Sequence, residues 1–164
     1  MGVRGRYAPK RRQTRFRPGS RPPALCPFQN SASGEICGLT DAYRYRPGQG
    51  WTRIADLPHA VVAAPTVAWD DHHILVFGGD DGRLAAQGTS LGDKHPGFRH
   101  EILSYDTKTD RWGVVQELPS LTVTTPASVR GRTIFIPTGE DRPGHRTTAV
   151  KALEPTANAQ AGQR

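Results

Sequence analysis

The sequence is poor in cysteine, methionine and long apolar runs. Its 164 residues include 2 Cys and 1 Met, and 35% of them are hydrophobic. The two cysteines, Cys26 and Cys37, are too few and too isolated for a structural zinc site, which needs four ligands at close spacing. A loop disulfide between them is geometrically possible, and two unremarkable thiols are the simpler interpretation. No window approaches the roughly 20 apolar residues of a membrane span, so no membrane role is expected.

Signals for export and for several enzyme classes are also missing. The N-terminus carries charge but lacks the apolar core of about 7 to 15 residues that a signal peptide requires, so the sequence alone does not assign a compartment. It contains no phosphate-binding loop, no nucleophile elbow and no zinc motif. We therefore expect neither a metal nor any other cofactor.

Acidic residues are absent before Glu35, which makes the charge distribution uneven. The formal net charge is +7, and eight basic residues precede Pro22, leaving 14 of the 22 basic residues against 15 acidic ones in the rest of the chain. The basic character is therefore a property of the N-terminal segment. Residues 1–40 are rich in Pro and Arg and have no apolar run, so we predict a disordered basic tail. Residues 155–164 are predicted to form a disordered C-terminal tail.

The basic tail has three interpretations. A nucleic-acid-binding arm would use its arginines on phosphates and Tyr7 and Phe16 on bases. The absence of Gly-Arg repeats and of a recognised binding fold favours a solvated tail instead, so nucleic acid is not the expected partner. A misplaced start site, which would make this segment non-native coding sequence, is the third.

Glycine and proline, by contrast, are abundant, with 18 and 14 residues, and long helical periodicities are missing. This composition favours a turn-rich all-β protein. The region 41–154 also repeats itself: three landmarks recur at one constant offset, and the segment 74–79 recurs at 134–139 with an offset shorter by one. The landmarks are Trp51, Leu57-Pro58 and Pro65, then Trp112, Leu118-Pro119 and Pro126.

Alternation and turn residues place four short strands in each period, which is typical of a propeller blade. We predict a partial β-propeller with one complete four-stranded antiparallel blade and parts of two others. Such an array cannot close by itself, so the sequence is interpreted as a gene fragment or as a chain that self-associates through its open blade faces. The predicted strands are 42–45, 51–54, 62–69, 73–77, 101–105, 111–115, 122–129, 133–136 and about 147–152.

The repeated region resembles the kelch repeat. Its hallmarks are a diglycine after the second strand and a spaced tyrosine and tryptophan, which correspond here to Gly78-Gly79, Tyr105 and Trp112. The resemblance covers residues 41–154. It implies a kelch β-propeller fold, a scaffold used both by enzymes and by protein-interaction modules.

The loop 139–150, GEDRPGHRTTAV, is similar to a loop of the sialic acid mutarotases, also called N-acetylneuraminate epimerases. This resemblance implies an isomerase that interconverts the α and β anomers of a sialic acid type sugar. It implies that Glu140 is the catalytic proton acceptor and that Arg146 lies in the substrate site. The family is often exported to the periplasm, and its propellers have six blades, more than this chain supplies.

Chemistry alone leaves alternatives open for this loop. A carboxylate such as Glu140 suits general-base catalysis, and a guanidinium such as Arg146 suits a substrate carboxylate. The two side chains are equally able to pair with each other across Pro143-Gly144 and hold the loop shape. The functional alternative is a non-enzymatic kelch module that binds a protein partner at the same loop face.

The histidines receive more modest predictions. His145 is expected to face solvent rather than to act as a second acid. His72 and His73 are expected at the surface, in a turn opposite the loop end. The long connection 80–100 holds His95 and His100, whose spacing does not indicate a metal site. A connection of about 20 residues is itself typical of a binding loop or of disorder.

Overall fold

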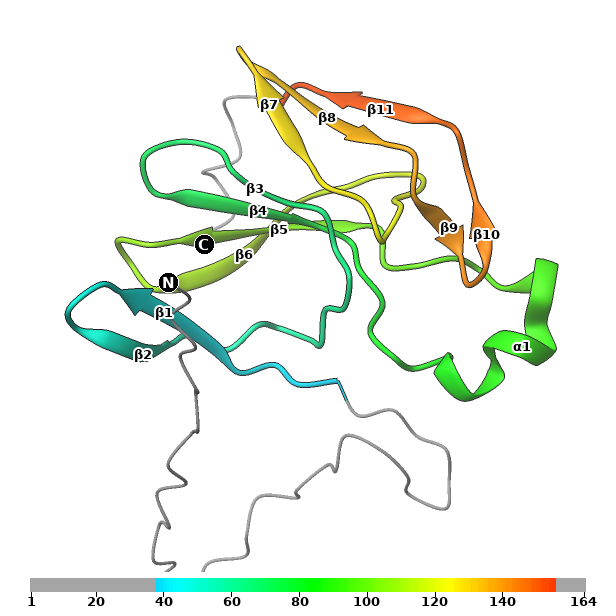
Figure 1. The fold of residues 1–164 in the computed structure, drawn as a ribbon, viewed down its shortest axis with the longest axis horizontal. Coiled ribbons are helices and arrows are strands. Elements are labelled where there is room, and N and C mark those ends of the chain that lie inside the picture. Colours follow the sequence, from blue (N-terminus) through cyan, green and yellow to red (C-terminus); the bar gives the residue numbers. More distant parts are fainter. Residues whose placement is uncertain (1–37, 156–164) are drawn as a thin grey trace, which may run out of the picture.

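Three antiparallel sheets, stacked one over the next, form the body of the computed structural model, which describes residues 38–155 (Figure 1). The predictions made for the basic tail, for Cys26 and Cys37 and for residues 156–164 lie outside the described residues. The predicted fold class is confirmed within them: the protein is all-β and forms part of a kelch-type β-propeller.

The middle sheet is one complete blade. Its strands run in sequence order from one edge to the other, and each is antiparallel to the next. These strands are β3 (Thr66–Ala68), β4 (His73–Phe77), β5 (Glu101–Asp106) and β6 (Arg111–Glu117).

Two incomplete blades flank it. Before it lies a hairpin that corresponds to the last two strands of a blade, β1 (Ala42–Arg46) and β2 (Gly50–Ile54). After it lies a three-stranded sheet in the order β11-β8-β7, which matches the order β5-β4-β3 of the complete blade. Its strands are β7 (Ser128–Arg130), β8 (Thr133–Pro137) and β11 (Val150–Leu153).

The aromatic landmarks of the repeat occupy equivalent places in both hairpins. Tyr45 lies opposite Trp51 with ring centroids 5.1 Å apart, and Tyr105 lies opposite Trp112 at 4.9 Å. The Trp112 indole Nε1 donates a hydrogen bond of 2.9 Å to the carbonyl of Ala55, which ties the first hairpin to the complete blade. Trp51 is 72% exposed because no sheet precedes its hairpin in the described residues.

The main core lies between the complete blade and the sheet that follows it. Alternate residues of β4 and β8 face each other there, including Phe77, Ile134 and Ile136, which are 1%, 0% and 0% exposed. Positions with the opposite parity, Val76 and Leu103, are buried on the other face of the complete blade. Burial on both faces is what a sheet between two neighbours requires, and it explains the apolar runs in these strands.

The predicted strands 62–69 and 122–129 are wrong in length, because each is broken near its start. Ala63 and Thr124 have φ angles of 56° and 57°, which no extended strand can accommodate. What precedes each break is an isolated bridge, and the regular strand begins only at β3 or β7. The two breaks stand at equivalent positions of the repeat, so the repeat includes this backbone irregularity. The predicted strand 147–152 also begins later, at β11.

Two connections contain structure that the sequence did not indicate. The long connection between β4 and β5 holds three short helical turns, Ala85–Gln87, α1 (Gly88–Leu91) and Gly92–Lys94. The connection between β8 and β11 holds a small hairpin of β9 (Glu140–Arg142) and β10 (His145–Arg146). Both are loops in the sequence-based prediction.

A strained threonine replaces the first glycine of the diglycine in the last blade. Gly78 has a φ of 61° and its counterpart Thr138 has a φ of 52°, although a β-branched residue disfavours positive φ. The Thr138 side chain is exposed, so glycine would lose little packing there. We expect Thr138→Gly to raise the free energy of unfolding by about 0.5 to 1 kcal/mol, the left-handed penalty less the chain entropy of glycine.

Urea denaturation followed by circular dichroism measures this effect. Thr52→Gly is the matched control, because Thr52 is exposed in the middle of the extended strand β2 and glycine weakens a strand interior. The strain interpretation is wrong if Thr138→Gly destabilises the protein as much as Thr52→Gly does.

Candidate functional site

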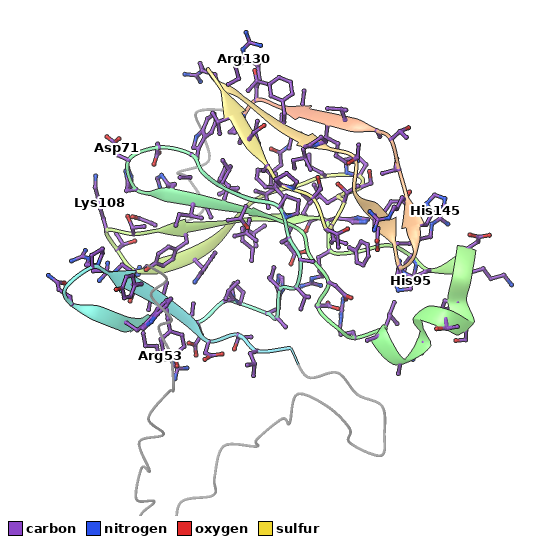
Figure 2. All side chains as sticks on the ribbon, viewed as in Figure 1. Arg53, Asp71, His95, Lys108, Arg130 and His145 are labelled. Atoms are coloured by element: carbon purple, nitrogen blue, oxygen red, sulfur yellow. The ribbon has the colours of Figure 1, made fainter. Side chains whose placement is uncertain are left out.

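The two elaborate connections of the fold meet at one end of the stacked sheets (Figure 1). The short turns after β1, β3 and β5 lie at the opposite end, as the antiparallel order requires. In Figure 2, His95 of the long connection and His145 of the β9–β10 hairpin lie at the elaborate end, and Asp71 and Lys108 at the other. We call the elaborate end the loop end. It carries Glu140 and Arg146, the two predicted site residues.

The hairpin brings Glu140 and Arg146 directly opposite each other. They are cross-strand neighbours, and Arg146 Nη2 lies 3.3 Å from Glu140 Oε1. Their side chains differ in exposure, at 18% for Glu140 and 77% for Arg146. The carboxylate is therefore held close to the fold while the guanidinium extends into solvent, where such a pair contributes at most about 1 kcal/mol.

The backbone of Glu140 is anchored independently of this pair. Its N–H donates to the carbonyl of Val123 and its carbonyl accepts from the Val123 N–H, at 3.0 and 2.9 Å. Asp80, the equivalent residue of the preceding blade, forms the same two hydrogen bonds with Val62. The carboxylate of Asp80, however, accepts a hydrogen bond from the N–H of Gly82, 2.8 Å away. Of the two equivalent acids, Glu140 is the one whose carboxylate contacts an exposed side chain, that of Arg146.

The remaining charged residues of the hairpin stabilise its shape. Asp141 Oδ1 accepts hydrogen bonds from His145 Nδ1 at 2.7 Å and from Arg142 Nε at 3.3 Å. Burial raises the pKa of Asp141, but these two hydrogen bonds outweigh it and lower the pKa below its ordinary value. Arg142 Nη1 also donates to the carbonyl of Asp93, at 2.7 Å, which joins the hairpin to the long connection. His145 is exposed, as predicted, and its hydrogen bond gives it a structural partner.

A cleft of about 530 Å³ lies at the same end, beside the long connection. Its walls carry several charged groups that the sequence-based prediction did not single out. Glu101 Oε1 lies 2.8 Å from Arg99 Nη2 and 2.6 Å from His59 Nε2, although the His59 contact lacks hydrogen-bond geometry. The cleft is lined by Asp80, Asp81, Arg83, Leu84, His95, Pro96, Gly97, Phe98, Arg99, His100, Glu101 and Glu117.

The cleft and the hairpin are parts of one surface. Gly97, which lines the cleft, lies so close to the hairpin that a Cβ atom at this position would be 3.0 Å from the carbonyl of Asp141. His95 is buried, and its Nδ1 accepts the N–H of Gly97 at 3.1 Å, which fixes the turn that makes this contact. The length of the connection 80–100 indicated a binding loop or disorder in the sequence. Length alone does not identify which charged side chains line a cleft.

The part of the chain that the structure describes has one group of three metal-ligating side chains close together, Asp70, His72 and His73, and it lies away from the loop end. His95 and His100 do not belong to such a group. No helix among residues 38–155 is long and apolar enough to cross a membrane. The loop end itself carries carboxylates, guanidinium groups and imidazoles.

Comparison with known proteins supports the fold more than any activity. No profile of a protein family matches the chain. The tRNA wybutosine-synthesizing protein 4 of Candida albicans is 39% identical over 51 residues, which are 31% of this chain and 7% of that protein. Among solved structures, the β-propeller protein YjhT matches with a TM-score of 0.60 at 23% identity, over 72% of this chain and 40% of that one. The chain thus spans less than half the length of either protein, and the likeness to YjhT shows a kelch-like propeller fold.

Proposed function

We propose that residues 41–154 form a kelch-repeat unit whose loop end binds a sugar acid of the sialic acid type. The observation that carries this proposal is the pairing of a partly buried carboxylate, Glu140, with an exposed guanidinium, Arg146, on one hairpin. The loop that holds them has the residue pattern of the sialic acid mutarotases. The corresponding activity is that of an isomerase that interconverts the α and β anomers by opening and closing the sugar ring.

Arg146 is the proposed substrate clamp. A guanidinium binds a carboxylate through two parallel N–H donors, which a lysine cannot reproduce. Its present contact with Glu140 is a single one of 3.3 Å, and its side chain is 77% exposed, so the contact can be exchanged at little cost. On binding, the carboxylate of the sugar replaces Glu140 as the partner of Arg146.

Glu140 is the proposed proton acceptor. Ring opening requires the anomeric hydroxyl to lose a proton and the ring oxygen to gain one, and the reverse transfers close the ring on either face. Once Arg146 has turned to the substrate, the Glu140 carboxylate is free to accept the proton of the anomeric hydroxyl and to give a proton to the ring oxygen as the ring opens; ring closure reverses both transfers. Its backbone bonds to Val123 keep it in place during this exchange.

The same geometry limits the rate that the chain reaches alone. The described residues supply one blade and parts of two, so the loop end is open to water on the sides where a closed propeller would have further blades. In water a glutamate hydrogen bond and an arginine–carboxylate pair each contribute only about 1 kcal/mol, and positioning is poor. We therefore expect binding through these residues but little catalysis by the chain alone.

NMR of freshly released α-N-acetylneuraminate tests this expectation. The wild-type chain should change the rate of α to β conversion by less than about twofold relative to buffer, because the site is not enclosed. Glu140→Gln tests the proton acceptor, and Glu117→Gln, a carboxylate of the adjacent cleft, is its matched control. A large acceleration would contradict the expected inactivity, and an acceleration that survives Glu140→Gln would refute the role of Glu140.

A second candidate function is a protein-interaction module, and the exposure of Arg146 favours it. If Glu140 serves only to pair with Arg146, the hairpin is a rigid charged projection on which a protein partner can dock. A partner captured by the wild-type chain should then be retained equally by Glu140→Gln, since the hairpin is also held by the Asp141 contacts. Loss of capture in that variant would argue against this function.

A further inference from the structure

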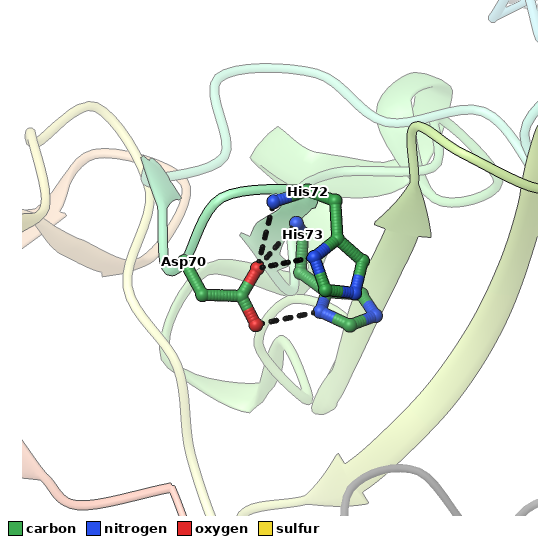
Figure 3. Close-up of side chains that lie close together, drawn as sticks. All are labelled: Asp70, His72 and His73. Carbon is green, nitrogen blue, oxygen red and sulfur yellow. Dashed lines mark hydrogen bonds and ion pairs between the residues drawn. The ribbon is translucent and has the colours of Figure 1, made fainter.

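The turn between β3 and β4, at the end opposite the hairpin, gathers a carboxylate and two imidazoles (Figure 3). Asp70, His72 and His73 each offer one ligand atom, and these atoms all lie within 4.8 Å of one another. Asp70 Oδ2 is 2.8 Å from His73 Nδ1, and Asp70 Oδ1 is 3.6 Å from His72 Nδ1. The proposed function makes no use of this group.

We propose that Asp70, His72 and His73 form a binding site for a divalent transition metal ion of the zinc class. Zinc bonds of about 2.0 to 2.1 Å in a tetrahedral arrangement place neighbouring ligand atoms about 3.3 Å apart. The three ligand atoms lie within 4.8 Å of one another, so small side-chain rotations bring them to this spacing. Two imidazoles with one carboxylate are a donor set of zinc and of other first-row transition metals rather than of Mg²⁺ or Ca²⁺, which take oxygen ligands.

The carboxylate is already oriented for this role. Asp70 Oδ1 accepts hydrogen bonds from the backbone N–H groups of His72 and His73, at 2.9 and 2.7 Å. When an ion binds, the hydrogen bond between His73 Nδ1 and Asp70 Oδ2 is exchanged for bonds to the metal, and the proton between them is released.

One imidazole nitrogen lacks a partner in the described residues. His72 Nδ1 is buried from solvent and makes no hydrogen bond, and its distance of 3.6 Å from Asp70 Oδ1 is too long for one. A buried polar atom of this kind is costly unless its lone pair is used. A metal ion held by His72 Nδ1 in the plane of its ring, together with His73 and Asp70, would use this lone pair.

The backbone around the group is restrained, while the side chains remain open to an incoming ion. The carbonyl of His73 accepts the N–H of Trp69 and that of His72 accepts the N–H of Thr107, at 2.9 and 2.8 Å. The side chains of His72, His73 and Asp70 are 24%, 18% and 39% exposed. Three protein ligands on a fixed turn leave a fourth position for water, as in sites that are not fully closed.

The chain itself, treated with a chelator and carrying Cys26→Ser and Cys37→Ser so that thiols do not compete, provides the test. Titration calorimetry with Zn²⁺ should show one equivalent bound, and Co²⁺ should give the visible absorption of a tetrahedral site. His72→Ala removes a ligand, and Asp70→Asn removes the charge while keeping an oxygen that caps the turn. Each should weaken binding by at least about tenfold.

Two controls separate this site from general histidine or carboxylate binding. Asp71→Asn changes the adjacent acid, and His145→Ala changes an exposed histidine at the loop end, so both should bind Zn²⁺ as the parent chain does. Side-chain nitrogen NMR of the parent chain should show zinc-dependent shifts at His72 and His73, a readout that needs no variant to fold. Absence of stoichiometric uptake, or uptake unchanged in both His72→Ala and Asp70→Asn, would overturn the proposal.

Discussion

Replacing Phe77 by alanine should remove about 3 to 5 kcal/mol of unfolding free energy, because a fully buried aromatic side chain would leave a cavity between two sheets. Phe77 is 1% exposed and belongs to the cluster that joins the complete blade to the sheet of β8. A domain of this size has roughly 5 to 15 kcal/mol of unfolding free energy in total, so the variant should lose a large share of its stability and unfold at a clearly lower urea concentration.

Thermal and urea denaturation measure this loss. Val114→Ala is the matched control: Val114 lies in β6 of the same sheet but is 55% exposed, and its truncation should change stability by less than about 0.5 kcal/mol. If Phe77→Ala were as stable as Val114→Ala, the contact between the two blades would not be the main source of stability, and the stacked-blade account would be wrong.

Gly78→Ala should be comparably severe for a different reason. Gly78 has a φ of 61°, and a Cβ atom there would lie 2.3 Å from the backbone carbonyl oxygen of Arg99. The left-handed backbone costs alanine about 1 to 2 kcal/mol. The clash must also displace the backbone at Arg99, next to the hydrogen bond that the Gly78 N–H donates to the carbonyl of Glu101. We expect a loss of about 3 kcal/mol or more in unfolding free energy, together with distortion of the adjacent cleft.

The chain offers a control that isolates the clash from the dihedral angle. Gly131 has nearly the same φ, 63°, and a Cβ atom there would have no neighbour within 4 Å. Gly131→Ala should therefore show only the backbone cost of about 1 to 2 kcal/mol in urea denaturation. Equal losses of unfolding free energy in the two variants would mean that glycine is required at position 78 only for its backbone angle, and not for the close approach of the Arg99 carbonyl.

The repeat made most of the architecture predictable. The nearly constant displacement between its copies placed the strands β4 and β8 and their glycines, because alternation and diglycine turns are local signals. The two broken strands were missed because a single left-handed residue, Ala63 or Thr124, has no distinctive sequence: neither is glycine or asparagine. The surrounding bridges determine these angles, and bridges are tertiary contacts.

The sequence predicted only the part of the site that lies within a single loop. Glu140 and Arg146 belong to the same short loop, and a hairpin brings them together. The cluster of His59, Arg99 and Glu101 joins segments that are far apart in the sequence, and it depends on the meeting of two different connections. Asp70, His72 and His73 are neighbours in the sequence, but the sequence did not indicate that the β3–β4 turn brings their side chains within ligand distance of one another.

A titration of the ¹⁵N-labelled chain with the β-methyl glycoside of N-acetylneuraminate tests the central claim most directly, because this sugar acid binds without interconverting. We expect chemical-shift changes at the amides of residues 139–149, lost in Arg146→Ala and retained in Arg130→Ala, an exposed arginine outside the loop end (Figure 2). Shifts that persist unchanged in Arg146→Ala, or no shifts near the hairpin at millimolar sugar, would contradict a sugar-acid site at Glu140 and Arg146.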